Sequence, residues 1–529
     1  MKSKGLYCYY YILVSSVCLC SSAAENTTTT TIDGSFKVNL TVNGETPTAV
    51  TDESFICATM DWWPMTKCNF GQCPWGNASV LNLDLENKIL AHAVKAFGNL
   101  RLRIGGSLQD RVVYKVGSFP KDCLHFRTRV NGLFGFSRGC LDMGRWDHMN
   151  KFFNETGAIV TFGLNALTGR RKSRYINNPM VGNWDPRNAL EFMNYTASKG
   201  YKIDSYEFGN ELCGEGVGAR VGAHQYGKDV TVLKNLTEGL YPADNSTTRP
   251  KLLGPGGFYD SRWFNIFLNT SGREVVDGLT HHLYSLGSGN DPTIIDKVQD
   301  PEFLDQVYST YTNISNSIKL FGPWTSAWVS EAGGAYTSGS KNVSRSFADG
   351  FWYLDQLGIA ASHDTKVFCR QTLIGGNYGL LDTTTFIPKP DYYGALLWHR
   401  LMGTKVLAAS HRGSKYLRVY SHCSKNTTGI TVLMINMSNS TRFEATVVVG
   451  DSQPYTDVNH KREEYHLTPK EGNILSDVVL LNGTPLNLTE SSDIPALNPK
   501  LIDPKSPIII APNSIVFATL KDVPAAACA

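Results

Sequence analysis

Short runs of apolar, partly β-branched residues recur between residues 53 and 400, and many of them end in Gly, Asn, Asp or Glu. Runs of this length and composition are typical of strands. The pattern predicts eight strands, at residues 55–61, 99–105, 158–165, 205–210, 251–256, 278–284, 326–331 and 366–374.

Segments with helical periodicity lie between these runs. Apolar residues recur at helical spacing over 83–97, and a helix is predicted over 186–199, with Asp185 as its N-cap and Pro in its first turn. Residues 346–357 and 392–402 have similar patterns. Eight alternations of strand and helix favour an α/β fold of the (β/α)8 TIM-barrel type over an open doubly wound sheet.

The pattern changes after residue 402. Residues 403–529 contain short β-like runs separated by turn residues, with almost no helical periodicity. This predicts an all-β domain, a β-sandwich. Within residues 25–52, the run 35–43 also reads as a strand, and no helix follows it. We expect this N-terminal strand to join the sandwich, and the barrel to occupy residues 53–402.

The first 24 residues predict a secretory signal peptide, with Lys2 and Lys4 before a short apolar run and small residues before the cleavage site. The alternative is a membrane anchor, but the run is shorter than the ~20 residues that a spanning helix needs. Fifteen Asn-x-Ser/Thr sequons favour an N-glycosylated protein of the secretory pathway. The cell wall, the extracellular fluid, the lysosome and the vacuole all remain possible destinations.

The cysteines fit an oxidising compartment. Of twelve cysteines, three lie in the predicted signal peptide and nine remain. An odd number leaves at least one thiol unpaired or bonded to another chain. We expect structural disulfides among the others, including one from Cys528 to Cys423 that would tie the C-terminal tail to the sandwich.

Charge excludes some functions. Lys and Arg number 50 against 47 Asp and Glu, a net charge of +3, which makes the chain a poor candidate for nucleic-acid binding. No segment after the signal peptide is long and apolar enough to span a membrane, although peripheral membrane association stays open. We expect no cofactor and no metal, because the pair His281-His282 lacks further ligands at metal-binding spacing.

Polar side chains collect where several of the predicted strands end. In a barrel these ends converge on one mouth, which is the usual place for an active site. The residues concerned are Asp61, Ser107, Asn165, Asn210, Glu211, His281, His282, Glu331 and Gln371.

Two of these strand ends carry a glutamate. The fourth strand ends in Asn210-Glu211 and the seventh in Glu331, followed by small residues that leave room for a ligand. A buried Glu can hold a proton near neutral pH and act as an acid, and Asn210 could bind a sugar hydroxyl. Paired carboxylates about 5–5.5 Å apart suit retaining glycoside hydrolysis, and a wider gap suits inversion. The nearby carboxylates Glu207 and Glu215 compete with Glu211, but we expect them to have supporting or structural roles.

The chain resembles glycoside hydrolase family 79, the heparanase-like β-glucuronidases, and most of all its plant members. The resemblance runs from about Asp61 to the C-terminus. The segments that carry it are 102–107 (LRIGGS), 162–167 (FGLNAL), 209–211 (GNE), 280–282 (THH), Glu331 with Ala335-Tyr336, 370–371 (RQ), 376–378 (GNY) and 403–407 (GTKVL).

The resemblance implies a retaining β-glucuronidase with Glu211 as general acid/base and Glu331 as nucleophile. It further implies substrate contacts from Asp61, Ser107, Asn210, Gln371, Gly376 and Tyr378. Tyr378 and the backbone amides of the Gly-rich turn would hold the uronate carboxylate, since such amides suit an anion. Arg103 could keep the nucleophile ionised by its charge, and His281 is a plausible hydrogen-bonding residue of the site.

The implied substrate is a glucuronate-containing glycan, for example of the arabinogalactan type, or a small glucuronide. The chain departs from the animal pattern, because the stretch between Ser107 and Trp146 is too short for an excised linker. The helix after the fifth strand also lacks the basic cluster that the animal heparanases use to bind heparin. Both differences argue against heparan sulfate as the substrate. Two alternatives remain: a catalytically silent carbohydrate-binding protein of the same family, and a retaining glycosidase for a neutral sugar.

Overall fold

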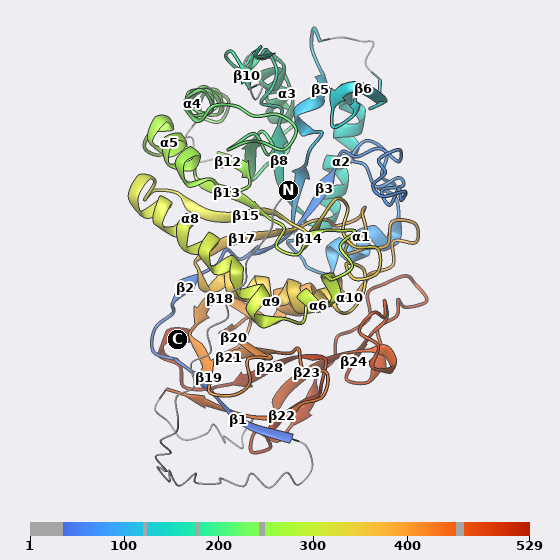
Figure 1. Ribbon diagram of the computed structural model, residues 1–529, viewed down its shortest axis with the longest axis vertical. Helices are drawn as coiled ribbons and strands as arrows, with labels where there is room; N and C mark the ends of the chain where they lie inside the picture. Colours follow the sequence, from blue (N-terminus) through green and yellow to red (C-terminus); the bar gives the residue numbers. More distant parts are fainter. Residues whose placement is uncertain (1–34, 120–123, 175–178, 243–248, 451–459) are drawn as a thin grey trace, which may run out of the picture.

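The structure is a computed structural model that describes residues 35–119, 124–174, 179–242, 249–450 and 460–529 (Figure 1). The predicted signal peptide lies outside the described residues. A strand barrel wrapped by helices forms one part of the molecule, and a strand-rich part lies beneath it, with α9 and α10 between the two.

The first part is a closed barrel of eight parallel strands in the order β11-β12-β13-β15-β17-β3-β4-β8. The predicted barrel is thereby confirmed, and every predicted strand is present with ends shifted by a few residues. The strands are β3 Ile56–Asp61, β4 Arg101–Gly105, β8 Ile159–Leu164, β11 Ser205–Phe208, β12 Lys251–Gly257, β13 Gly278–Leu283, β15 Ser326–Ala332 and β17 Thr365–Arg370.

Helices surround the barrel. They are α1 Lys88–Lys95, α2 Met143–Thr156, α3 Arg187–Ser198, α4 Ala223–Leu240, α5 Ser261–Ser271, α6 Ile294–Lys297, α7 Pro301–Leu304, α8 Tyr308–Phe321, α9 Asp349–Ser362 and α10 Pro390–Leu401.

One predicted helix start was wrong for a local reason, and another was confirmed. The helix expected over 83–97 begins only at Lys88, because the Asn87 side chain accepts the N–H of Leu90 at 3.1 Å and caps the helix there. Asp185 caps α3, as predicted. Its Oδ1 accepts the backbone N–H of Arg187 at 3.2 Å, and its Oδ2 also accepts a bond from the Arg187 guanidinium at 2.6 Å.

The loops after the barrel strands carry short strands of their own. After β4 come β5 Val112–Lys115, β6 Thr128–Leu133 and β7 Gly139–Asp142, and β5 pairs with β7. After β8 come β9 Arg171–Lys172 and β10 Met180–Val181. The loops after β13 and β15 are joined by the pairing of β14 Gly287–Ser288 with β16 Ala335–Tyr336. These pairings hold together loops that leave the carboxyl ends of the strands, where the site is expected.

The strand-rich part contains two sheets. One has the order β19-β1-β22-β27, and the other runs β2-β18-β20-β21-β28-β23-β24-β25, with β26 paired to β23. The bounds are β1 Ser35–Val42, β2 Ala49–Val50, β18 Met402–Leu407, β19 Ala409–His411, β20 Leu417–Ser424, β21 Gly429–Asn436, β22 Arg442–Val449, β23 Arg462–Pro469, β24 Val479–Leu481, β25 Thr484–Pro485, β26 Lys500–Ile502, β27 Ile508–Ile510 and β28 Ser514–Lys521.

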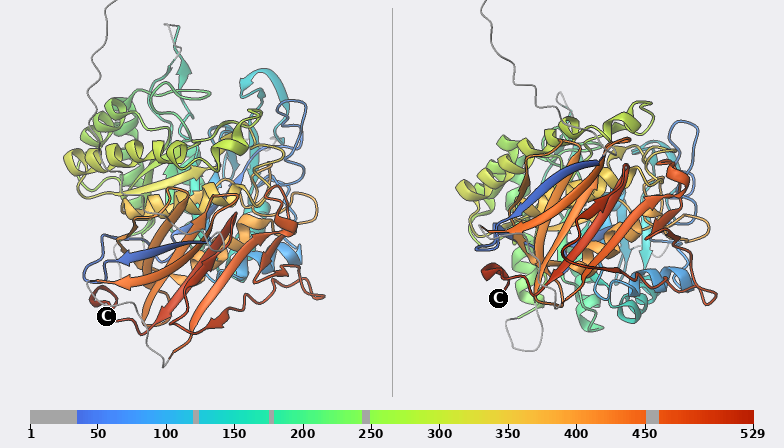
Figure 2. Two further views of the ribbon diagram at one scale, coloured as in Figure 1. Left: turned by 60° about the horizontal axis from the view of Figure 1, so that its bottom comes forward. Right: turned by 90° about the horizontal axis from the view of Figure 1, so that it is seen from below.

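The N-terminal strand joins the sandwich, as predicted. β1 pairs with β22 in parallel over its whole length and with β19 in the antiparallel sense. Figure 2 shows it in blue among the orange and red strands of the C-terminal region. Leu40 of β1 and Phe443 of β22 are fully buried in an apolar cluster with Val432 and Val516 of the other sheet. The two sheets therefore share one core.

The barrel and the sandwich are joined by a polar contact within a largely buried interface. Asp355 of α9 accepts bonds from Arg418 at 2.8 Å and from the Tyr420 hydroxyl at 2.6 Å, both on β20. The Asp355 side chain is fully buried, and an unpaired buried carboxylate would be costly. These bonds therefore tie the position of the second sheet to that of the barrel.

Disulfides brace both parts. Cys57 and Cys369 join the neighbouring barrel strands β3 and β17, and Cys68–Cys73 closes a loop after β3. Cys423–Cys528 ties the C-terminal turn to β20, as predicted from the sequence. Cys213 is buried and free, in agreement with the odd cysteine count. Within the described ranges, every helix is too short or too polar to cross a bilayer.

Candidate active site

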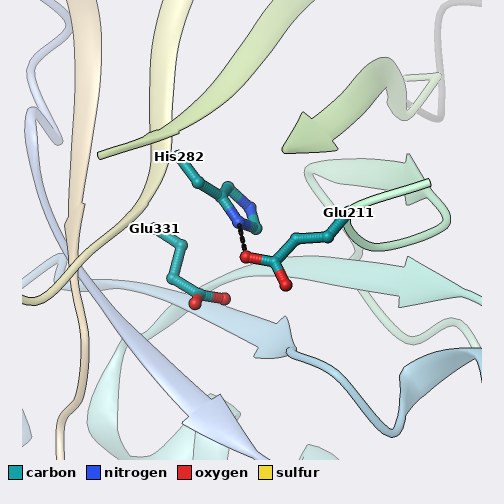
Figure 3. Close-up of side chains that lie close together, drawn as sticks. All are labelled: Glu211, His282 and Glu331. Carbon is teal, nitrogen blue, oxygen red and sulfur yellow. Dashed lines mark hydrogen bonds and ion pairs between the residues drawn. The ribbon is translucent and has the colours of Figure 1, made fainter. Parts of the chain in front are cut away.

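Glu211 and Glu331 meet at the carboxyl ends of their strands. Glu211 lies three residues beyond β11, and Glu331 is the penultimate residue of β15. One oxygen of each carboxylate and one ring nitrogen of His282 all lie within 4.8 Å of one another (Figure 3). This spacing is compatible with the short carboxylate separation of a retaining glycosidase.

The backbone around Glu211 aims its side chain into the barrel mouth. Glu211 has a φ of +54°, a left-handed conformation that L-residues adopt rarely, and Gly209, two residues earlier, has a φ of +73°. The N–H of Glu211 donates to the Gly256 carbonyl at 2.7 Å, which holds this turn against the end of β12. Burial raises the pKa of Glu211 to about 7, although the charge of Arg103 opposes the rise. The carboxyl can thus carry a proton near neutral pH.

Glu331 has a different environment. Its Oε2 accepts a bond from Arg103 Nη1 at 2.8 Å, and its Oε1 accepts one from the Tyr284 hydroxyl at 2.6 Å. Both oxygens of this nearly buried carboxylate accept a hydrogen bond, so the side chain is held in one orientation. The two glutamates therefore differ in their surroundings: burial dominates at Glu211, whereas two donors face Glu331.

Arg103 forms hydrogen bonds with three polar side chains of the site. Its fully buried guanidinium donates to Glu207 at 2.6 Å, to Glu331 at 2.8 Å and to Asn210 Oδ1 at 2.8 Å. Burial alone would raise the pKa of Glu207, but the charge of Arg103 outweighs it and holds that pKa below its ordinary value. The structure thus places Arg103 on the predicted nucleophile and gives Glu207 a supporting contact. Glu215 instead lies exposed, bound to Arg220 at 2.9 Å.

The chemistry of Arg103 also sets the tautomer of His282. Arg103 Nη2 lies 3.4 Å from His282 Nε2, and a guanidinium can only donate, so Nε2 is the acceptor. The proton therefore sits on Nδ1, which donates to Glu211 Oε1 at 3.0 Å. Burial lowers the pKa of His282 to about 4, so the ring is neutral at neutral pH.

His281, the histidine expected at the site, lies elsewhere. Its ring is fully buried against Tyr311 of α8, with ring centroids 5.7 Å apart, on the helix side of the strand. Successive strand residues face opposite sides, so only one of two adjacent histidines can point into the barrel. Tyr284, two residues beyond His282, faces the same way. The sequence placed His282 among the strand-end residues, but His281 was selected as the site contact. Tyr284 was not predicted as a site contact, although strand alternation links it to His282.

Three predicted substrate contacts form one cluster beside Glu331. Gln371 Nε2 donates to Asp61 Oδ2 at 2.9 Å and lies 3.5 Å from the Tyr378 hydroxyl oxygen. Burial, and then the charge of Glu331, raise the pKa of Asp61 to about 7. A Cβ atom on Gly333 would lie within 3.2 Å of Tyr284, Tyr378 and Gln371. Glycine at this position therefore leaves these side chains packed closely around the site.

The remaining predicted contacts differ in what they can still bind. Asn210 is buried, and its Nδ2 has no hydrogen-bond partner in the described part of the chain, so it can donate to a sugar hydroxyl. Ser107 is half-buried in the turn after β4. The amide of Gly376 already donates to Pro74 at 3.1 Å, and that of Asn377 donates to Ser338 at 2.8 Å. These two amides of the Gly-rich turn are therefore engaged, contrary to their expected role as carboxylate ligands.

The Glu211–His282–Glu331 group is the one cluster in the described ranges with the spacing of a metal site. The fully buried Arg103 guanidinium bonds Glu331 and approaches His282. A positive charge at this position repels a cation, and each Glu331 oxygen already accepts one hydrogen bond. The group is better suited to proton transfer and nucleophilic attack than to metal binding.

Comparisons with known proteins support a sugar-cleaving chemistry. The family model described as glycosyl hydrolase family 79, N-terminal domain, matches residues 37–358. Heparanase-like protein 2 of Arabidopsis thaliana is 50% identical over 517 residues, covering 93% of this chain and 95% of that protein. Baicalin-beta-D-glucuronidase of Scutellaria baicalensis is 43% identical over 488 residues, covering 90% of this chain and 91% of that protein.

Among solved structures, the GH51 arabinofuranosidase of Xanthomonas axonopodis pv. citri matches with a TM-score of 0.64 at 15% identity, covering 92% of this chain and 100% of that one. At this identity the likeness speaks for the fold alone.

Proposed function

The chain belongs to glycosyl hydrolase family 79, and from this premise we propose that it is a retaining β-glucuronidase with Glu211 as acid/base and Glu331 as nucleophile. The observation that carries the proposal is the contrast between two carboxyl groups whose oxygens lie within 4.8 Å of each other. Burial favours a proton on Glu211, whereas Arg103 and Tyr284 donate to Glu331.

In the first step, Glu331 attacks the anomeric carbon and forms a glycosyl ester, while Glu211 gives its proton to the departing glycosidic oxygen. Arg103 and Tyr284 hold the Glu331 carboxylate by its two oxygens, so the nucleophile needs little reorientation. The aglycone leaves as an alcohol or phenol, and Glu211 is left as a carboxylate.

In the second step, the Glu211 carboxylate takes a proton from water, the water oxygen adds to the anomeric carbon, and the ester bond to Glu331 breaks. His282 supports this state, because its Nδ1–H donates to the Glu211 carboxylate at 3.0 Å. The neutral ring stabilises the anion without supplying a charge that would hold Glu211 ionised throughout the cycle.

A positive charge near the sugar site supports an acidic sugar over a neutral one. Lys67 is half-buried in the loop after β3, and its ammonium lies 4.3 Å from the centre of the Trp63 ring. No acidic side chain lies within ion-pair distance of it among the residues that the structure describes. Burial lowers the pKa of Lys67, and the charge of Asp61 opposes that effect. Lys67 and the Tyr378 hydroxyl are therefore the groups we assign to the uronate carboxylate.

The substrate is thus a small glucuronide or a glucuronate-bearing glycan, such as one of the arabinogalactan type, met along the secretory route or in the cell wall or vacuole. The presence of both carboxylates favours a hydrolase over a silent carbohydrate-binding protein.

The test is hydrolysis of an aryl β-D-glucuronide beside the matching β-glucoside and β-galactoside, by the wild type and by Glu331→Gln and Glu211→Gln. We expect turnover of the glucuronide, with a loss of at least about 100-fold in each variant. Preference for a neutral glycoside would overturn the specificity. Inactivity toward all three would favour the binding protein.

A further inference from the structure

Phe258 is an exposed aromatic side chain at the barrel mouth, directly after the end of β12. It keeps 42% of its surface exposed, although most aromatic rings of the barrel are buried. Its ring centroid lies 6.4 Å from that of His282 and 6.2 Å from that of Tyr284. One neighbour thus contacts Glu211 and the other contacts Glu331.

The backbone ties Phe258 to the Glu211 side of the site. The backbone N–H of Glu211 donates to the Gly256 carbonyl at 2.7 Å, and the thiol sulfur of Cys213 lies 3.3 Å from the Phe258 carbonyl oxygen. A Cβ atom on Gly257 would lie 3.0 Å from the Glu211 Cα. These contacts hold the Phe258 backbone beside the backbone of Glu211, the residue proposed to protonate the leaving oxygen.

A second exposed apolar side chain belongs to the same region. Val217 keeps 52% of its surface exposed, and its N–H donates to the Glu211 carbonyl at 3.3 Å. When a ligand covers exposed apolar side chains at a catalytic mouth and removes them from water, the free energy of the complex is lowered. The backbone of Val217, and that of Gly256 two residues before Phe258, are both bonded to the Glu211 backbone. In a retaining glycosidase the leaving group departs on the side of the acid/base residue.

The polar groups next to Phe258 already form hydrogen bonds within the protein. His282 uses Nδ1 on Glu211 and Nε2 on Arg103, and the Tyr284 hydroxyl is bonded to Glu331. The hydroxyl of the following Tyr259 is bonded to Ser317. A sugar in the leaving-group position would need partners for its hydroxyls, whereas a flat apolar group would need only the ring face.

We propose that Phe258, with Val217, forms an aglycone subsite for a planar aromatic leaving group, so that the enzyme acts on aryl glucuronides. The inference rests on the proposed function, because the role of Glu211 there defines the leaving-group side. It goes beyond that function by choosing a phenolic aglycone over a sugar.

The experiment compares three substrates that share the glucuronyl group: 2-naphthyl β-D-glucuronide, 2,2,2-trifluoroethyl β-D-glucuronide and a glucuronyl-galactose disaccharide. Intrinsic leaving-group reactivity cancels when each variant is compared with the wild type on the same substrate. For Phe258→Ala we expect kcat/KM to fall about tenfold on the naphthyl substrate and less than about twofold on the trifluoroethyl one. Phe258→Trp should retain the wild-type value within about threefold.

Phe36 provides the control, since it is 46% exposed on β1 of the sandwich, away from the mouth. Phe36→Ala should leave all three substrates unchanged. An equal loss on all three substrates in Phe258→Ala, or the largest loss on the disaccharide, would overturn the aromatic subsite.

A binding measurement separates this inference from the proposed function. Calorimetric titration with free 2-naphthol should give a Kd about tenfold weaker for Phe258→Ala than for the wild type. If the wild type hydrolyses no glucuronide but shows this difference, the proposed function fails and the subsite stands. If 2-naphthol binds both proteins equally, the subsite fails whatever the activity.

Discussion

The raised pKa of Glu211 predicts a specific dependence of stability on pH. In the unfolded chain Glu211 titrates near its ordinary value of 4.5, and in the folded protein near about 7. Below the first value both states carry the proton and folding is not penalised. As the pH rises toward 7, the unfolded chain releases the proton but the folded protein keeps it, so stability is lost until the folded group also ionises.

The size of this effect follows from the two pKa values. A difference from 4.5 to about 7 corresponds to about 3 kcal/mol between the protonated and ionised forms. Between about pH 5 and about pH 8.5 the loss is roughly 2 to 3 kcal/mol, because part of it is already present at the lower pH. Glu211→Gln removes the titrating group and keeps an oxygen that can accept the His282 bond.

The quantity to compare is the stability of Glu211→Gln minus that of the wild type. We expect this difference to be larger at about pH 8.5 than at about pH 5, by roughly 2 to 3 kcal/mol. Denaturant unfolding of both proteins at the two pH values measures this difference. Glu215→Gln is the matched control in the same loop, because the Glu215 side chain is 81% exposed and should show no such dependence. A stability difference that is the same at both pH values would exclude a raised pKa of Glu211 in the folded protein.

Three further outcomes follow from the site. kcat/KM for an aryl glucuronide should fall as the pH rises above about 7, since the Glu211 proton needed in the first step is lost; a pH–rate profile checks this, and a flat alkaline limb would contradict it. Arg103→Met should cost about 3–5 kcal/mol of stability and at least about 100-fold in kcat, because Glu207 and Glu331 lose their shared cation; unfolding and steady-state assays measure both, and unchanged activity would remove Arg103 from the mechanism. Lys67→Met should lower kcat/KM about tenfold on the glucuronide but not on the matching glucoside; equal effects on the two would exclude Lys67 from carboxylate recognition.

The barrel could be predicted from the sequence because its strands are separate apolar runs, with segments of helical periodicity between them. The strand ends then located Glu211 and Glu331. Helix starts were less predictable, since one hydrogen bond accepted by the Asn87 side chain makes α1 begin more than a full turn later than expected. The predicted Glu pair depended on strand order alone, whereas the distance between the carboxylates required the closed barrel.

The choice between His281 and His282 could not be read from the sequence. The pairing of β13 with β15 shifts in register between these two residues, so a simple alternation counted from either end gives no reliable phase. The amides of Gly376 and Asn377 were misjudged for a different reason. Their partners, Pro74 and Ser338, come from distant loops that no local pattern brings together.

A retaining mechanism requires that Glu331 form a covalent bond to the sugar. Incubation with 2-deoxy-2-fluoro-β-D-glucuronyl fluoride, followed by peptide mapping, tests it directly, because the fluorine slows release of the glycosyl-enzyme. We expect one added fluoroglucuronyl group per chain, on Glu331, and loss of that label in Glu331→Gln. An enzyme that turns over glucuronides but yields no label, or carries it on Glu207 or Glu211, would contradict Glu331 as the nucleophile.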